Sequence, residues 1–344
     1  MRIGAIELPN RLFVAPMAGV TDRPFRQLCK RLGAGYAVSE MVTARKDLWA
    51  SLKTSRRANH DGETAPIAVQ IAGTDAPMMA EAAAYNIDRG AQIIDINMGC
   101  PAKKVCSKWA GSALMQDEPL ALAIVEAVVA VCAPRGVPVT LKMRTGWRAD
   151  RRNAVALARA AEAAGIAMVT VHGRTREQGY KGLAEYDTIA EVKSRLRIPV
   201  VANGDIDSPR KAAEVLARTG ADAIMIGRAA QGRPWIFGDI THYLATGAER
   251  PQPEVRDVQR WMIEHLHDHY GLYGEGAGAR TARKHIGWAV RALPGGESFR
   301  SLVNTIDDAA LQLRVVDDWF GELALAHRRL PANAPIGNGM MEAA

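Results

Sequence analysis

The stretch Ile93-Ile94-Asp95-Ile96-Asn97-Met98-Gly99-Cys100-Pro101 predicts a buried β-strand that ends in a tight turn. Its β-branched residues favour a pleated strand, and its glycine and proline are typical of the turn that follows. Similar apolar runs recur along the chain, with room for a helix between neighbours. The eight strands that we expect are residues 12–15, 36–39, 67–70, 93–97, 137–143, 168–172, 200–203 and 223–226.

The segments between these runs are amphipathic and rich in alanine, as residues 120–131, 154–164 and 210–217 illustrate. Such composition and periodicity predict helices. Strands that alternate with helices eight times predict a (β/α)8 TIM barrel. A doubly wound sheet would more often carry a G-x-G-x-x-G turn after its first strand, and this sequence has none there.

The chain changes character after the barrel. No strand-like run follows residue 250, and residues 255–270, 278–292 and 301–330 have the pattern of helices. We therefore expect a barrel domain over residues 1–244 and a small all-helical domain over residues 250–330. The tail, residues 331–344, is rich in Pro, Asn and Gly and is expected to be disordered.

Composition favours a globular protein of the cytoplasm. The 344 residues hold four cysteines and no long apolar run, so neither a disulfide framework nor a membrane span is expected. Without a long apolar seam, we expect a monomer. The net charge of +7 lies in the first part, since residues 1–244 carry 33 of the 44 Lys and Arg but 24 of the 37 Asp and Glu. This surplus suggests a polyanionic partner.

Polar residues that follow the strands are the candidates for an active site, because the mouth of such a barrel is formed by the C-terminal ends of its strands. Gly204 and Gly227 allow a close backbone approach, and Arg228 supplies a fixed cation. Together they predict a site for a phosphate-bearing cofactor. His172 either binds the phosphate or satisfies a backbone carbonyl, and its position alone does not decide between the two.

Lys142 and Gln70 occupy strand ends where an aromatic cofactor would lie. A lysine at the inner end of a strand needs an anionic partner, either a reduced flavin or a structural carboxylate. The Gln70 amide offers a donor and an acceptor to a flavin's pyrimidine edge.

Cys100 lies on a turn just beyond a strand, which exposes a thiol that would ordinarily be buried. An unperturbed thiol keeps its proton near neutral pH and can act as a general acid. The alternatives are a nucleophile and an inert turn residue. Lys103, Lys104 and Lys108 lie close in sequence and would favour the thiolate, so the sequence leaves the role open.

Basic residues follow several strands and form a charged rim that suits a phosphodiester backbone better than a small neutral substrate. In the helical part, residues 280–291 contain no acid and give one basic face. His265, His267 and His269 form a histidine-rich segment without a nearby cysteine. We expect these histidines to lie on a solvated or RNA-facing helix surface, with no metal bound.

The strand-end motifs together resemble those of the tRNA-dihydrouridine synthases. The segment Arg283-Lys284-His285-Ile286-Gly287-Trp288 is similar to a signature of the bacterial B subfamily. The resembling barrel motifs are residues 15–22, 70–73, 95–101, 142–147, 172–176, 203–205 and 226–228.

This resemblance implies an oxidoreductase that binds FMN and takes electrons from NADPH, with NADH as a possible reductant. Cys100 would protonate C5 of a D-loop uridine in tRNA while hydride reaches C6, giving 5,6-dihydrouridine. The implied cofactor contacts are Pro16, Met17, Ala18, Gln70 and Lys142 at the ring, and His172, Asn203, Gly204, Asp205, Gly227 and Arg228 at the phosphate.

The candidates for tRNA contacts are Asn97, Lys103, Lys104, Arg144, Arg174, Arg283, Lys284 and His285. The tRNA would have to release a stacked base into the pocket. The alternative function is a small-molecule flavin oxidoreductase on the same barrel, which would leave the rim charge and the helical domain unexplained.

Overall fold

The computed structural model describes residues 1–331 of the chain. Its main sheet is entirely parallel, with the strand order β4-β3-β11-β10-β9-β8-β7-β6-β5. The strands are β3 (Leu12–Val14), β4 (Tyr36–Ala37), β5 (Val42–Thr43), β6 (Ala68–Ala72), β7 (Ile93–Met98), β8 (Val139–Arg144), β9 (Met168–His172), β10 (Val200–Asn203) and β11 (Ala223–Ile226). The predicted alternation of strands and helices in a TIM-like barrel is confirmed.

The second predicted strand is divided in two. β4 pairs with β3, β5 pairs with β6, and the segment between them forms a parallel bridge from Val38 to Ala68. The backbone N–H of Ser39 also donates to the Ala68 carbonyl at 3.0 Å. β4 and β5 are therefore two pieces of one barrel strand, and the ring closes between β3 and β6.

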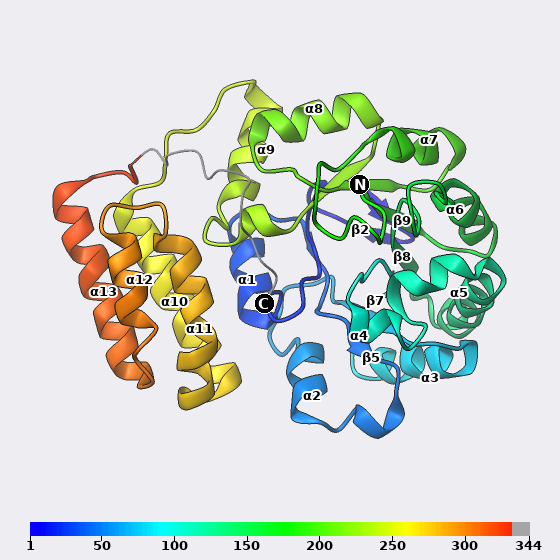
Figure 1. Cartoon of the computed structure of the whole chain (residues 1–344), viewed down its shortest axis with the longest axis horizontal. Helices are drawn as coiled ribbons and strands as arrows, with labels where there is room; N and C mark the ends of the chain where they lie inside the picture. The colour runs from blue at the N-terminus through cyan, green and yellow to red at the C-terminus, as the bar shows by residue number, and fades with distance from the viewer. Residues whose placement is uncertain (332–344) are drawn as a thin grey trace. The chain divides into compact units, whose positions relative to one another are not determined.

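Helices connect successive strands, and their ends follow ordinary capping chemistry. The helix α8, for example, begins after Ser208, whose Oγ accepts a hydrogen bond from Lys211 N, and ends at Gly220 with a φ of 65°. The helices of this part are α1 (Arg23–Arg31), α2 (Leu52–Ala58), α3 (Ala76–Ile87), α4 (Lys103–Cys106), α5 (Glu118–Cys132), α6 (Ala154–Ala163), α7 (Asp187–Arg195), α8 (Pro209–Thr219) and α9 (Ile236–Thr246). Helices α3, α5, α6, α7 and α8 lie on the outside of the parallel strands (Figure 1). Short 3-10 turns are η1 (Lys46–Leu48), η2 (Gly111–Gln116), η3 (Ala133–Arg135) and η4 (Arg228–Ala230).

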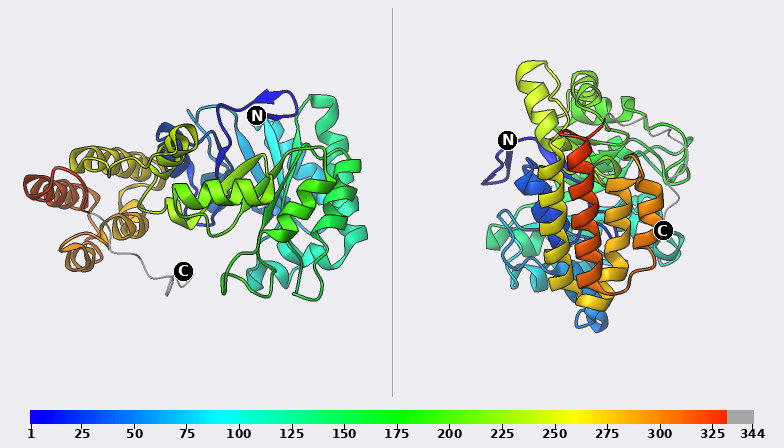
Figure 2. Two further views of the ribbon diagram at one scale, coloured as in Figure 1. Left: turned by 90° about the horizontal axis from the view of Figure 1, so that it is seen from above. Right: turned by 90° about the vertical axis from the view of Figure 1, so that its left-hand side faces the viewer.

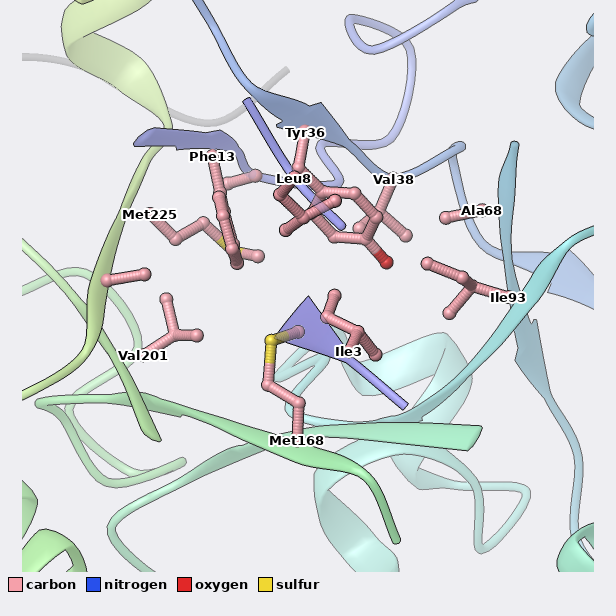
Figure 3. Packing of buried hydrophobic residues seen from close by; sticks show 12 residues of the cluster. Ile3, Leu8, Phe13, Tyr36, Val38, Ala68, Ile93, Met168, Val201 and Met225 are labelled. Atoms are coloured by element: carbon pink, nitrogen blue, oxygen red, sulfur yellow. The ribbon is translucent and has the colours of Figure 1, made fainter. Parts of the chain in front are cut away.

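Apolar side chains fill the interior of the barrel (Figure 3). The rings of Phe13 and Tyr36 meet edge to face at 4.8 Å, and Ile3 joins the cluster from the hairpin of β1 (Arg2–Ile3) and β2 (Ile6–Glu7). This hairpin lies at the N-terminal end of the strands, since Gly4 faces Pro138, which precedes β8. With that end packed, the loops that follow the strands are the place for a ligand.

Four helices form the C-terminal part (Figure 2). They are α10 (Val255–Tyr273), α11 (Glu275–Val290), α12 (Gly296–Val303) and α13 (Ala309–Ala326). The single helix expected over residues 301–330 is wrong, because the chain breaks between α12 and α13. Asp308 caps the new helix by accepting a hydrogen bond from Leu311 N.

The chain divides into two compact units. One comprises Met1–Ala230 and Trp235–Gly247, and the other comprises Gln231–Pro234 and Ala248–Ala344. Residues 332–344, most of the tail that was expected to be disordered, lie outside the described residues. Within residues 1–331, no helix is both long and apolar enough to cross a membrane.

Candidate active site

A chain of buried hydrogen bonds links three neighbouring strands at the mouth of the barrel. Asn97 Nδ2 donates to Gln70 Oε1 at 2.7 Å, and Gln70 Nε2 donates to Asp95 Oδ2 at 2.6 Å. Asp95 also accepts a 2.6 Å bond from the hydroxyl of Thr140. Each polar group in the chain has its partner, so the amides of Gln70 and Asn97 are held in one orientation.

Asp95 and Lys142 are charged residues of this site whose pKa values are shifted by burial. Burial raises the pKa of the Asp95 carboxyl to about 6, while hydrogen bonds from Thr140 and Gln70 oppose that rise. Burial also lowers the pKa of Lys142 to about 8, and the nearby Arg144 guanidinium lowers it further. The Lys142 ammonium donates to Asn203 Oδ1 at 3.1 Å. The hydrogen-bond partner of Lys142 is therefore the Asn203 amide oxygen, while the Asp95 carboxylate attracts the ammonium through its charge.

The turn that carries Cys100 is fixed on both sides. Asn97 Oδ1 accepts hydrogen bonds from the backbone N–H groups of Gly99 and Cys100, at 3.2 and 3.0 Å. The carbonyl of Cys100 accepts 2.8 Å and 3.1 Å bonds from the hydroxyl and the N–H of Ser112. Asn97 therefore shapes the turn and also contacts Gln70.

The protonation state of Cys100 was open in the sequence. Its side chain is half-buried, and burial raises the pKa of the thiol above its ordinary value. The weaker attractions of Arg144 and Lys142 act in the opposite direction. Lys103, Lys104 and Lys108 are exposed. The thiol therefore keeps its proton at neutral pH, as a general acid must.

The backbone at Gly204 requires glycine. Its φ is 124°, and a Cβ there would lie 2.8 Å from the Ala184 side chain and 3.0 Å from His172. The Tyr186 hydroxyl donates to the Gly204 carbonyl at 2.8 Å. Burial, followed by the positive charge of Arg144 and other cations, lowers the pKa of His172 well below its ordinary value. The imidazole is therefore neutral and can donate one N–H to an anion.

The Asp205 side chain is paired with two arginines. Its carboxylate is 2.6 Å from Arg174 Nη2 and 3.2 Å from Arg228 Nη2, and it accepts the N–H of Ala184 at 2.7 Å. A carboxylate repels a phosphate, so any phosphate contact at Asp205 falls to its backbone. The side chain orients the two guanidinium groups.

The predicted cofactor residues come together at this mouth. A Cβ on Gly227 would lie 3.4 Å from Met17 Sδ and 3.5 Å from Ala15, so the loop after β3 lies beside the end of β11. Thr21 supports that loop, because its hydroxyl oxygen accepts the N–H of Met17 at 2.7 Å and donates to the Ala15 carbonyl at 2.9 Å. Pro16, Met17 and Ala18 are at least partly exposed there.

Two predicted tRNA contacts lie beneath the surface. Arg144 is 1% exposed and donates to the carbonyls of Gly99, Thr175 and Gly179. Arg174 is 2% exposed and paired with Asp205. Both hold loops in place, and the expected position of Arg174 on an open basic rim is wrong. Lys103 and Lys104 are exposed as expected.

Sequence reasoning missed the roles of Asp95 and Tyr180. Asp95 was part of a motif but was not considered as a site residue. The Tyr180 ring lies 5.5 Å from the Arg144 guanidinium and 5.2 Å from that of Arg228, and it is 48% exposed. Its place in the loop after β9 is the signal that would have drawn attention to it.

The expected solvated or RNA-facing surface is wrong for His265 and His269, whereas His267 is exposed. His265, His269 and His285 are 2%, 0% and 4% exposed. His285 therefore cannot contact a tRNA surface directly. Arg283, another predicted tRNA contact, is paired with Asp307 at 2.7 Å and donates to the Ile306 carbonyl. Lys284 is partly exposed.

Comparison with known proteins gives one family. The family model described as dihydrouridine synthase matches residues 13–324. A tRNA-dihydrouridine synthase B of Pseudomonas aeruginosa is 58% identical over 322 residues, which cover 94% of this chain and 96% of that protein. One of Xanthomonas campestris pv. campestris is 56% identical over 323 residues, with the same coverage. The solved morphinone reductase shares the fold, with a TM-score of 0.52 and 14% identity over 74% of this chain and 90% of that one.

Proposed function

This chain belongs to the dihydrouridine synthase family, and we propose that it reduces the C5–C6 double bond of a D-loop uridine in tRNA to 5,6-dihydrouridine. FMN is the flavin of this proposal and NADPH is the reductant. The observation that carries it is the half-buried thiol of Cys100, whose pKa is raised by burial and which is held on a fixed turn beside the amide chain.

The residues at the mouth fit a flavin phosphate at one side. Gly204 has the conformation and the crowding that exclude a side chain, and Gly227 leaves open backbone beside Met17. Arg228 supplies the cation, oriented by Asp205, and neutral His172 supplies a donor. Two glycines, a guanidinium and a nearby imidazole are the chemistry that a phosphate monoester needs.

The other side of the mouth fits a flavin ring. Gln70 and Asn97 present oriented amides, and Lys142 supplies a positive charge. A flavin held by these residues would supply the hydride chemistry that links NADPH to C6 of the uracil. Lys142 would stabilise the negative charge of the reduced flavin, since a cation near its pyrimidine edge favours that form.

Cys100 would complete the reduction. As hydride reaches C6, electron density moves to C5, and Sγ–H of Cys100 would transfer its proton there. The thiolate left behind is stabilised by Arg144 and Lys142, whose charges lower the pKa of this thiol. Solvent would then return the proton. The hydride from NADPH carries both electrons of the reduction, and Cys100, reprotonated by water, supplies the one further proton.

Exposed cations would hold the tRNA. Lys103 and Lys104 open α4, three residues beyond Cys100, and would contact phosphates near the flipped base. In the helical unit we keep Lys284 and Arg283 as candidates for RNA contact. We further infer that the protein acts in the cytoplasm as a monomer, which its four free cysteines suit.

The test is the variant Cys100→Ala with Cys106→Ser as its matched thiol control. Purified Cys100→Ala should keep FMN and oxidise NADPH, yet form at least 100-fold less dihydrouridine in unmodified tRNA, measured by nucleoside mass spectrometry. Cys106→Ser should keep most activity because its hydroxyl still donates to the Cys100 carbonyl. Equal product from Cys100→Ala and wild type would refute the acid role. Turnover with free uracil and none with tRNA would favour the small-molecule oxidoreductase.

A further inference from the structure

Three buried histidines meet inside the helical unit. His265 and His269 lie one turn apart on α10, and His285 faces them from α11. The imidazole of His285 is 4.9 Å from that of His265 and 5.4 Å from that of His269, measured between ring centroids. One nitrogen from each ring can be chosen so that all three lie within 4.8 Å of one another. Within residues 1–331 this is the group of histidine, cysteine and acidic residues whose geometry suits a metal ion.

The spacing has a simple origin in the helix. Residues i and i+4 share one face, so His265 and His269 point the same way while His267 points to solvent. Gly274, with a φ of 77°, joins α10 to α11 as a single-residue link. Because the link is a single residue, α11 folds back along α10 and places His285 beside His265 and His269. The cluster therefore connects two helices that adjoin one turn.

A hydrogen-bond relay fixes the tautomer of His269. Its Nε2 lies 2.8 Å from the hydroxyl oxygen of Thr281. That hydroxyl has one proton, which it donates to the Ala277 carbonyl at 2.8 Å. Thr281 must then accept, so Nε2 of His269 carries the proton and Nδ1 carries the lone pair. A ligand histidine is ordinarily oriented in this way, through its second nitrogen.

From this geometry we infer that His265, His269 and His285 bind a Zn²⁺ ion that fastens α10 to α11. Three neutral imidazoles suit Zn²⁺, which binds histidine at about 2.0–2.1 Å in a tetrahedral site. Ligand nitrogens in such a site are roughly 3.4 Å apart. Side-chain rotations that shorten the present separations, which are at most 4.8 Å, by up to about 1.4 Å would form it. A water molecule would take the fourth position.

The site would also order the neighbouring basic segment. His285 directly follows Lys284 and lies two residues beyond Arg283, which is held by Asp307. A metal at His285 would restrict this turn of α11 within the helical unit. The inference is independent of the proposed reaction, since its readouts are metal content and thermal unfolding.

The experiment uses the full chain, purified without a histidine tag. Metal analysis by plasma mass spectrometry should find about one zinc per chain in the wild type and in the control His267→Gln, which alters the exposed histidine of the same helix. His269→Gln and His285→Gln should each lose at least five-sixths of that zinc. After removal of metal with a chelator, adding Zn²⁺ should raise the melting temperature of the wild type by roughly 5 °C and leave the two variants unchanged.

Two results would overturn the inference. The first is a wild type that contains less than one zinc per ten chains and, after chelation, neither binds Zn²⁺ in a titration nor melts at a higher temperature with it. This measurement needs no variant, so it stands even if His285→Gln fails to fold. The second is loss of the zinc from Cys100→Ala, which would place the metal at the thiols of the barrel.

Discussion

Lys142 and Asn203 are joined by a 3.1 Å hydrogen bond from Nζ to Oδ1, between strands β8 and β10. Asn203 donates its own amide to the Met225 carbonyl at 2.8 Å, so its oxygen can only face the lysine. The ammonium group is thus fixed where burial has lowered its pKa to about 8. A charge held in this way at a barrel mouth stabilises an anion without first having to reorganise.

Replacing Lys142 with Met should lower the two-electron midpoint potential of the bound flavin. The reduced, anionic flavin loses the cation that stabilises it, whereas the oxidised, neutral ring loses little. Reduction by NADPH should slow by about tenfold or more, as measured by stopped-flow absorbance. Lys142→Arg keeps a positive charge and should keep a potential close to that of the wild type. A Met variant with an unchanged potential would show that Lys142 does not face the flavin.

Asp95 should make stability depend on pH in an unusual direction. The carboxyl pKa is about 6 in the folded chain, above the ordinary value of 3.8, so the folded state binds the proton more tightly than the unfolded state does. The free energy of unfolding of the flavin-free protein should therefore fall by about 1 kcal/mol from pH 5 to pH 7, relative to Asp95→Asn. Urea unfolding at both pH values measures the difference. Parallel pH curves for the two proteins would contradict the assignment.

Asp95→Asn should also impair the reaction itself. Asparagine offers one acceptor oxygen where the carboxylate offers two, to Gln70 Nε2 and to the Thr140 hydroxyl. When that oxygen bonds to Thr140, its NH2 group faces the Gln70 NH2 group, and Gln70 has to turn over to bond with it. Asn97 would then lose its 2.7 Å acceptor, and with it the orientation that supports the Cys100 turn. Product formation should fall by about tenfold with FMN still bound. The control is Thr140→Val, which removes one donor to Asp95 but leaves the two amides in register, and it should retain more activity.

Gly204 and Gly227 should respond differently to alanine. At Gly204 the positive φ and the contacts with Ala184 and His172 penalise any side chain, so Gly204→Ala should destabilise even the flavin-free protein by about 1–3 kcal/mol. At Gly227 a methyl group meets nothing closer than 3.4 Å, so Gly227→Ala should fold with normal stability. If the phosphate approaches this backbone, Gly227→Ala should nevertheless bind FMN at least tenfold more weakly in fluorescence titrations. Unchanged FMN affinity would show that the phosphate does not contact the Gly227 backbone.

The fold was predictable from the sequence because each strand carries its own signal. A short apolar run closed by turn residues identifies a barrel strand wherever it lies, and barrel topology places the residue after it at the mouth. The second strand was predicted at residues 36–39, but its division into β4 and β5 had no local signal, since the pairing of Val38 with Ala68 depends on closure of the ring. Hydrogen-bond chains such as that from Asn97 to Asp95 join separate strands, so no local pattern contains them.

The burial of the histidine cluster was not predicted, although the sequence contains the pattern that indicates it. Val258, Met262, His265, Leu266 and His269 are buried and follow one another at helical spacing. This is the apolar stripe of an amphipathic helix, and it places two histidines on its inner face. The prediction of a solvated surface gave more weight to the polarity of histidine than to the helical spacing of these residues. Arg174 was misplaced for the same reason, since its charge suggested a rim while Asp205 holds it inside.

The exposed cations of α4 give the last prediction. Changing both Lys103 and Lys104 to Ala should raise the KM for tRNA by about tenfold and leave NADPH-dependent flavin reduction unchanged, because only the RNA contacts are lost. The slope of log KM against log salt should fall by about 1.5. The matched control changes Arg135 and Arg197 to Ala; these exposed residues lie before β8 and β10, at the opposite end of the barrel. Equal effects of the two double variants on KM and on the salt slope would show that net charge, and not a contact at α4, governs tRNA binding.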